Sequence, residues 1–162
     1  MAIDLVPPGA ARSNPAAMQA GASMSEFDEV FDWVVVGSGA GSMSSALVMR
    51  RAGKSVVVLE KSPFVGGTTA KSGGVMWVPC NRFMAADGDP DSAEAAITYL
   101  DAVCPDGPEF PGTSPARRRA YVAEATRMVD FLVSEGVALE RGSKFWPDYY
   151  DDRPGGSGTQ GR

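Results

Sequence analysis

Residues 32–60, which read DWVVVGSGAGSMSSALVMRRAGKSVVVLE, decide the fold. An apolar run at 33–36 breaks into the glycine turn GSGAG at 37–41, small residues follow, and a second apolar run at 56–59 ends on Glu60. Two short apolar runs separated by a segment long enough for a helix are typical of a βαβ unit with parallel strands. We therefore predict two core strands joined by a helix, with a nucleotide at the mouth of the unit.

The glycine turn resembles a dinucleotide fingerprint. Gly37 allows a sharp turn off the first strand, and Gly39 lets the backbone approach a pyrophosphate closely. The following helix points unpaired N–H groups and the positive end of its dipole at that anion. Ser42 replaces the third glycine, which serves helix packing, so we expect a looser fit and an intact site. The alternative is a tight strand-to-helix turn that binds nothing.

Glu60 ends the second apolar run, at the distance from the turn where a carboxylate accepts hydrogen bonds from ribose hydroxyls. A carboxylate there would repel the 2′-phosphate of NADP, so the sequence argues against that coenzyme.

Composition excludes several other functions. The chain has 162 residues and a net charge of −5, which disfavours a nucleic-acid partner, and we expect the basic cluster at 117–119 to be a solvated helix face. The two cysteines, Cys80 and Cys104, have no metal-binding spacing, and the chain has no histidine. Zinc chemistry and a histidine-based triad are therefore excluded within this chain, and we expect reduced thiols and a cytoplasmic location.

The chain divides into a leader and a domain. Residues 1–26 are rich in Ala, Pro, Ser and Gly without apolar periodicity, which predicts a flexible leader; no run approaches the length of a membrane span. We expect residues 27–162 to form the N-terminal part of a nucleotide-binding domain, including the start of a substrate-side segment. Because a doubly wound sheet needs more than two strands, we predict an incomplete sheet of a Rossmann-like α/β fold, belonging to something larger.

A second glycine-rich stretch, KSPFVGGTTAKSGG at 61–74, has neither helical nor alternating periodicity. Paired glycines permit positive φ and close backbone approach, and Thr68, Thr69 and Ser72 offer hydroxyls to phosphate, ribityl or ring atoms. We predict a ligand-binding loop; the alternative is an ordinary flexible turn. The apolar run at 75–79 is either a short strand or pocket wall, with Trp77 as a packing residue.

Two helices are predicted in the second half. The first starts at Asp91 as N-cap, with Glu94 completing a capping box. The second starts at Pro115, after a cap by Ser114 or Thr113, and ends at Gly136. Its core stripe at helical spacing consists of Tyr121, Val122, Ala125, Met128, Val129, Leu132 and Val133.

Residues 137–141 are a candidate short strand. The aromatic cluster FWPDYY at 145–150 follows in a non-periodic segment. Its side chains either plug the edge of a core or line a pocket for a flat apolar substrate.

Four stretches resemble the N-terminal part of the flavin-dependent 3-ketosteroid Δ1-dehydrogenases. These are VVVGSGAGS, VLEKSPFVGGTTAKSGGVMWVP, PDSAEAAITYLDA and KFWPDYY. Such enzymes belong to a wider group of FAD enzymes that includes fumarate reductases and succinate dehydrogenase flavoproteins. The glycine turn and Glu60 fit the whole group, whereas GGTTAKSGG and WPDYY are more typical of the steroid branch.

The resemblance implies that FAD is the cofactor. It places the pyrophosphate against the glycine turn, the adenosine ribose on Glu60, and the ribityl chain and isoalloxazine ring along the second glycine-rich stretch. The implied cofactor-binding residues are Gly37, Ser38, Gly39, Ala40, Gly41, Glu60, Lys61, Gly66, Gly67, Thr68, Thr69, Ser72, Gly73 and Gly74.

The resemblance also implies 1,2-desaturation of a 3-ketosteroid. Tyr149, with Tyr150 as the fallback, would support a second tyrosine that takes the proton; that tyrosine and the donors to the carbonyl belong to later segments of such enzymes. We therefore expect a small apolar, steroid-like substrate, and the remainder of the enzyme or a complementary chain as partner. Two alternatives remain open: another FAD-dependent reductase or dehydrogenase of the fumarate reductase group, and a non-catalytic truncated FAD-binding fragment.

Overall fold

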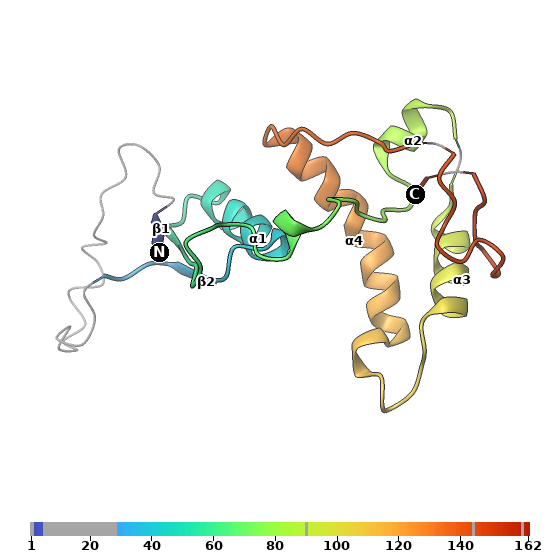
Figure 1. Cartoon of the computed structure of the whole chain (residues 1–162), viewed down its shortest axis with the longest axis horizontal. Coiled ribbons are helices and arrows are strands. Elements are labelled where there is room, and N and C mark those ends of the chain that lie inside the picture. Colours follow the sequence, from blue (N-terminus) through green and yellow to red (C-terminus); the bar gives the residue numbers. More distant parts are fainter. Residues whose placement is uncertain (1, 5–28, 90, 144, 160) are drawn as a thin grey trace. The chain divides into compact units, whose positions relative to one another are not determined.

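The computed structural model describes residues 2–4, 29–89, 91–143, 145–159 and 161–162 (Figure 1). It consists of two compact units, Met1–Gly74 and Val75–Arg162, each of which is described by itself.

A small sheet with one covering helix forms the first unit. Strands β2 (Trp33–Val36) and β3 (Val56–Leu59) are parallel, with Trp33 opposite Val56, and helix α1 (Ala40–Arg51) connects them. Figure 1 shows α1 beside these strands, which it contacts. The predicted βαβ unit is therefore confirmed.

A third strand, β1 (Ala2–Asp4), pairs antiparallel with the other edge of β3, giving the order β1-β3-β2. These three residues fall within the stretch that we expected to be a flexible leader. An open strand edge carries unpaired N–H and C=O groups, which any extended segment can satisfy. The rest of that stretch, Met1 and residues 5–26, lies outside the described residues, as do residues 27–28.

The core of the first unit lies between the sheet and α1. Buried Val35, Val56 and Val58 meet Ala46 of the helix. On β2, by contrast, Val36 is 80% exposed. Parallel strands are normally covered on both faces, so the described residues form an incomplete sheet of an α/β fold, as predicted.

Helices dominate the second unit. They are α2 (Arg82–Ala86), α3 (Ala93–Val103), the short 3₁₀ helix η3 (Pro111–Thr113) and α4 (Pro115–Ser134). The α4 residues Ala125 and Val129 are buried together with Val78, and Val122 and Leu132 are buried as well, as predicted for the core stripe. Tyr121, which is also predicted for that stripe, is 45% exposed, so the prediction is wrong at this position. No helix among the described residues is both long and apolar enough to cross a membrane.

The ends of α4 are as predicted. The Ser114 hydroxyl accepts a hydrogen bond from the Arg117 N–H, and Gly136 follows the helix with a φ of +87°. The predicted cap of α3 is wrong, because Ser92 rather than Asp91 is the N-cap, and its hydroxyl accepts from the Ala95 N–H. Asp91 is engaged elsewhere, in an ion pair with Arg162.

The candidate strand at 137–141 is also wrong, because these residues form no strand in the structure. The Val137 N–H instead caps the Leu132 carbonyl at the end of α4. Arg141 forms ion pairs with Asp87 and Asp89, with N···O distances of 2.6 and 2.7 Å. The run at 75–79 has no strand either, which leaves the wall interpretation for that segment.

Candidate functional site

The glycine turn joins the end of β2 to the start of α1. Gly37 has a φ of +88°, which side chains disfavour, and its N–H donates to the Leu59 carbonyl at 2.7 Å. Gly39 is the N-cap of α1 and has no side chain to cap the helix, and the first turn contains no acidic residue. The positive end of α1 therefore lies at the carboxyl edge of the parallel strands, where an anion is stabilised.

Open space surrounds two of these glycines. A Cβ added to Gly39 would lie 3.7 Å from the Thr69 hydroxyl oxygen, which is an ordinary contact, and one added to Gly41 would meet nothing within 4 Å. Gly39 also has the extended backbone angles φ −68° and ψ 169°. The chain itself could therefore carry side chains here. Glycine at both positions is explained if a diphosphate must approach the backbone closely there. The glycine turn at the start of α1 therefore fits a diphosphate.

The second glycine-rich loop lies against this turn. The Thr69 hydroxyl accepts a hydrogen bond from the Ala40 N–H at 3.1 Å, and a Cβ on Gly67 would lie 3.9 Å from the Gly39 nitrogen. A hydroxyl that accepts one hydrogen bond can still donate its own hydrogen. Thr69 can thus contribute to an anion site at the N-terminus of α1.

Glu60 lies at the end of β3 and is buried, with 8% of its surface exposed. Its carboxylate accepts hydrogen bonds from the Ser38 hydroxyl, from the Ser38 N–H at 3.0 Å and from the Ser62 N–H at 2.9 Å. These bonds, chiefly the one from the Ser38 hydroxyl, hold the pKa of Glu60 below its usual range. The structure therefore presents a fixed, ionised acceptor beside the glycine turn.

Ser38 makes a contact that its position in the glycine turn does not predict. Its side chain is buried, and its hydroxyl oxygen also accepts a hydrogen bond from the Gly66 N–H at 2.8 Å. One hydroxyl thus joins the turn, the Glu60 carboxylate and the second glycine-rich loop. Such a bridge depends on residues 22 and 28 positions away, so spacing alone gives no signal for it.

The remaining predicted cofactor residues also lie in the first unit. Gly66 has a φ of +106°, and a Cβ there would lie 2.5 Å from the Ala70 side chain, so the loop itself requires this glycine. Thr69–Lys71 form the 3₁₀ helix η2 with Thr68 as its N-cap. The Ser72 hydroxyl bonds within its own loop, to the Thr69 carbonyl and the Gly74 N–H. The remaining two, Lys61 and Gly73, are exposed.

Ser42, which stands in place of the third fingerprint glycine, is partly buried on α1. Its hydroxyl donates to the Val36 carbonyl at 3.5 Å, so the extra side chain reaches back to the end of β2. The glycine turn keeps its form with serine at this position.

Replacing Ser38 with Ala is expected to cost stability in a pH-dependent way. The Ser38 hydroxyl lowers the pKa of Glu60 only in the folded chain, so the stability it contributes is present above the unfolded pKa, about 4.3, and is lost as the pH falls through the lowered folded value. The difference in unfolding free energy between parent and Ser38→Ala should therefore shrink on acidification. The part that remains at low pH is the contribution of the hydrogen bond from the Gly66 N–H to the Ser38 hydroxyl, which does not depend on pH. Denaturant titrations of both proteins at pH 7 and at several acidic pH values measure it.

Ser62→Ala is the matched control, because the Ser62 backbone N–H, and not its side chain, bonds Glu60. Its difference from the parent should not depend on pH. A Ser38→Ala difference that stays equally constant would contradict the assignment of the carboxylate contact.

The candidate catalytic Tyr149 lies in the second unit. Its side chain is 91% exposed, and its ring packs edge-on against Tyr150 with the ring centroids 5.3 Å apart. Asp148, one residue earlier, is by contrast 4% exposed and accepts a hydrogen bond from the Trp77 indole N–H at 2.7 Å. Trp77 also lies against Tyr99 and Tyr121, which agrees with the packing role predicted for it.

Comparison with known families identifies the nucleotide. The model of a family described as "FAD binding domain" matches residues 32–161. The chain belongs to this family. FAD is accordingly the cofactor.

Among curated members, the 3-oxosteroid 1-dehydrogenase of Mycobacterium tuberculosis strain H37Rv is 40% identical over 126 residues, which are 78% of this chain and 22% of that protein. The 4-oxocyclohexanecarboxylate 2-dehydrogenase of Sinomonas cyclohexanicum is 43% identical over 129 residues, 77% of this chain and 21% of that protein. The chain thus spans about a fifth of the length of these relatives.

A solved structure of a similar protein shows the same fold. The 3-ketosteroid Δ1-dehydrogenase from Sterolibacterium denitrificans, in complex with 1,4-androstadiene-3,17-dione, superposes with a TM-score of 0.68 at 34% identity, covering 81% of this chain and 22% of that one. The resemblance to steroid dehydrogenases given by the four motif stretches is therefore confirmed.

Proposed function

We propose that this chain forms the nucleotide-binding part of an FAD-dependent enzyme that desaturates a ring ketone next to its carbonyl, with a 3-ketosteroid as the substrate. One observation carries the proposal: relatives named for such reactions match more than three quarters of the chain, at 40% and 43% identity. In both names the oxo group and the dehydrogenated position are two ring atoms apart. The shared chemistry is thus loss of hydrogen from the carbons α and β to the carbonyl.

The first unit would hold the cofactor. The Gly39 amide and the Thr69 hydroxyl, which accepts from the Ala40 N–H, would bind the diphosphate, because they lie at the positive end of α1. Glu60, fixed by Ser38, would accept the ribose hydroxyls. The residues from Gly66 to Gly74 would follow the ribityl chain and the isoalloxazine ring. Bound FAD supplies the hydride acceptor, while the protein orients the substrate and excludes water.

The second unit would contribute one group to the proton transfer. The exposed Tyr149 phenol would donate a hydrogen bond to a second tyrosine and so stabilise the phenolate form of that tyrosine, which is the form that takes the proton from the carbon α to the ketone. Donors at the ketone oxygen would stabilise the charge that develops there. We propose that these further groups come from protein sequence equivalent to the rest of the relatives, in the same polypeptide or a second one, and that the enzyme acts in the cytoplasm.

A second candidate substrate is a small ring ketone without the steroid rings. The 43% identity to the 4-oxocyclohexanecarboxylate dehydrogenase favours it directly. The two candidates differ in the size of the apolar body that the enzyme must accept, and not in the chemistry at the carbonyl.

The product of the complete reading frame that contains this chain tests both candidates. It should be assayed with an artificial electron acceptor on a 3-ketosteroid and on 4-oxocyclohexanecarboxylate, and separately for fumarate reduction. We expect 1,2-desaturation of the steroid. Turnover of the small ketone alone would favour the second candidate, and activity with fumarate alone would overturn both. The purified 162-residue chain, examined for flavin absorbance, shows whether this part binds FAD by itself.

Tyr149→Phe is expected to lower turnover in that product by about a hundredfold, within the range for general acid–base groups. FAD content should stay unchanged, because the residues proposed to hold the cofactor are in the other unit. Steady-state kinetics and flavin-to-protein absorbance ratios measure the two effects. Tyr150→Phe is the matched comparison, since Tyr150 lies next in the chain and is 51% exposed. Equal turnover in Tyr149→Phe and the parent would remove Tyr149 from the mechanism.

A further inference from the structure

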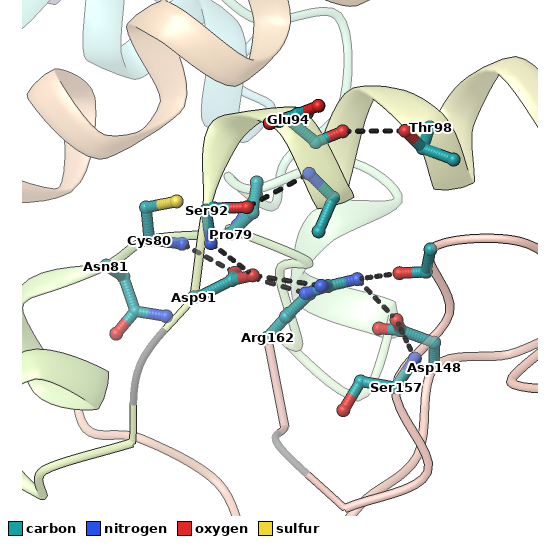
Figure 2. A network of polar contacts seen from close by, with 12 residues as sticks. Pro79, Cys80, Asn81, Asp91, Ser92, Glu94, Thr98, Asp148, Ser157 and Arg162 are labelled. Atoms are coloured by element: carbon teal, nitrogen blue, oxygen red, sulfur yellow. Dashed lines mark hydrogen bonds and ion pairs between the residues drawn. The ribbon is translucent and has the colours of Figure 1, made fainter.

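A buried arginine joins two buried aspartates in the second unit (Figure 2). The side chain of Arg162 is 3% exposed, and those of Asp91 and Asp148 are each 1% exposed. The guanidinium forks onto Asp91, with its Nε 3.1 Å and its Nη2 2.9 Å from the two carboxylate oxygens. Its Nη1 donates to Asp148 at 2.8 Å and to the Gly155 carbonyl at 2.8 Å. Every nitrogen of the guanidinium is therefore engaged.

Backbone N–H groups and an indole N–H donate further hydrogen bonds to the carboxylates of Asp91 and Asp148. Asp91 also accepts hydrogen bonds from the N–H of Cys80, just before α2, and from the N–H of Ser92, at the start of α3. Asp148 accepts from the Trp77 indole and from the Ser157 N–H at 2.9 Å. Buried charges are tolerated when they are paired and hydrogen-bonded in this way. The network thus binds the segment around Asp148 to α3 and to the end of the described chain.

Tyr149 lies between two points that are held in place. On one side, the Asp148 N–H donates to the Ser157 carbonyl at 2.7 Å while its side chain is bound in the network. On the other side, the Tyr150 N–H donates to the Tyr99 hydroxyl at 3.1 Å. Tyr149 itself is exposed, so the anchored backbone, more than packing of its ring, sets the direction in which its phenol points.

Stability alone gives little reason for such a network. A buried ion pair is often no more stabilising than well-packed apolar residues of the same volume, and its best-supported benefit is a unique geometry. The nearby pair Arg153–Asp152 shows the contrast: both side chains are more than half exposed, and the N···O distance is 4.0 Å. The charged side chains of this contrast are therefore either exposed to solvent, as at Asp152 and Arg153, or buried and hydrogen-bonded, as at Asp148 and Arg162.

We propose that Arg162 is a positioning residue for Tyr149. By clamping Asp148 against Asp91, it fixes the backbone from which the Tyr149 phenol projects towards its partner in the proton transfer. The proposal rests on the proposed function, in which Tyr149 takes part. It adds Arg162 and Asp91, which lie outside the FWPDYY segment, to the residues on which the reaction depends.

The decisive experiment observes Tyr149 directly. 3-Fluorotyrosine is placed at position 149 of the full chain, and its ¹⁹F resonance is recorded in the parent, Arg162→Met and Arg162→Lys. We expect one resonance in the parent and several, or one at least twice as broad, in Arg162→Met. Arg162→Lys should resemble Arg162→Met, because an ammonium cannot make the fork onto Asp91 while bonding Asp148. The matched control is Arg153→Met in the same loop, which should give the parent spectrum.

A parent-like resonance in a folded Arg162→Met would overturn the proposal. If circular dichroism shows that Arg162→Met does not fold, Arg162→Lys decides the question by the same criterion. Activity is read separately: in the product of the complete reading frame, Arg162→Lys should lower kcat by about tenfold to a hundredfold, as a small misplacement does, with unchanged flavin content. Absence of turnover of both ring ketones in the parent would refute the proposed function, whereas the ¹⁹F comparison would still test the clamp.

Discussion

Replacing Gly39 with Val is expected to empty the flavin site and leave the fold of the chain intact. The backbone at Gly39, with φ −68° and ψ 169°, suits a β-branched residue, and the position of a Cβ is free of close contacts with the chain. The added methyl groups would instead fill the space through which phosphate oxygens reach the amides of α1. We expect FAD affinity to fall on the order of a hundredfold or more, about 2.7 kcal/mol.

The measurement is the flavin-to-protein absorbance ratio after purification, together with circular dichroism to check the fold. Gly112→Val is the matched control, because a Cβ at Gly112 in η3 meets nothing within 4 Å and the position lies outside the first unit. It should retain the FAD content of the parent. A Gly39→Val protein with normal flavin content would show that the diphosphate does not approach the backbone at this turn.

Gly155→Ala is expected to destabilise the second unit by about 2–5 kcal/mol, the sum of a left-handed backbone penalty and a steric overlap. Gly155 has a φ of +75°, and a Cβ there would lie 2.4 Å from the Ala95 carbonyl oxygen and 2.7 Å from the Tyr99 nitrogen. Both atoms belong to the backbone of α3, which cannot move aside as a side chain can. The loop would have to leave the helix, and the Gly155 carbonyl would lose the guanidinium of Arg162.

Denaturant unfolding measures the loss, and limited proteolysis locates it in the loop after Asp148. Gly158→Ala in the same loop is the control, because its Cβ would meet only the Asp151 carboxylate at 3.6 Å, an ordinary contact. That variant should stay within about 0.5 kcal/mol of the parent. If the two variants were equally stable, the close packing of this loop on α3 would be wrong.

The first unit could be predicted from sequence because its determinants are local. The run of valines, the glycine turn and Glu60 lie within 29 residues, and both the strand pairing and the start of α1 follow from their order. The role of Ser38 could not be predicted in this way. Its hydroxyl bridges Glu60 and Gly66, and a hydroxyl in a glycine turn is equally consistent with a phosphate contact.

The second unit was harder to predict because its polar contacts are distant in sequence. Asp91 and Ser92 are both good N-caps, and the choice of Ser92 follows from Arg162, 71 residues away, which binds Asp91. Asp148 between aromatic residues could have suggested a buried carboxylate, which requires a partner. Its partner, however, follows a glycine-rich stretch with no local pattern that indicates a buried ion pair.

The most direct test of the account is a crystal structure of the protein with FAD bound. We predict diphosphate oxygens within hydrogen-bonding distance of the Gly39 amide and of the Thr69 hydroxyl, and ribose hydroxyls on the Glu60 carboxylate. FAD bound with its diphosphate away from the start of α1, or a crevice that stays empty in excess FAD, would contradict the central claim.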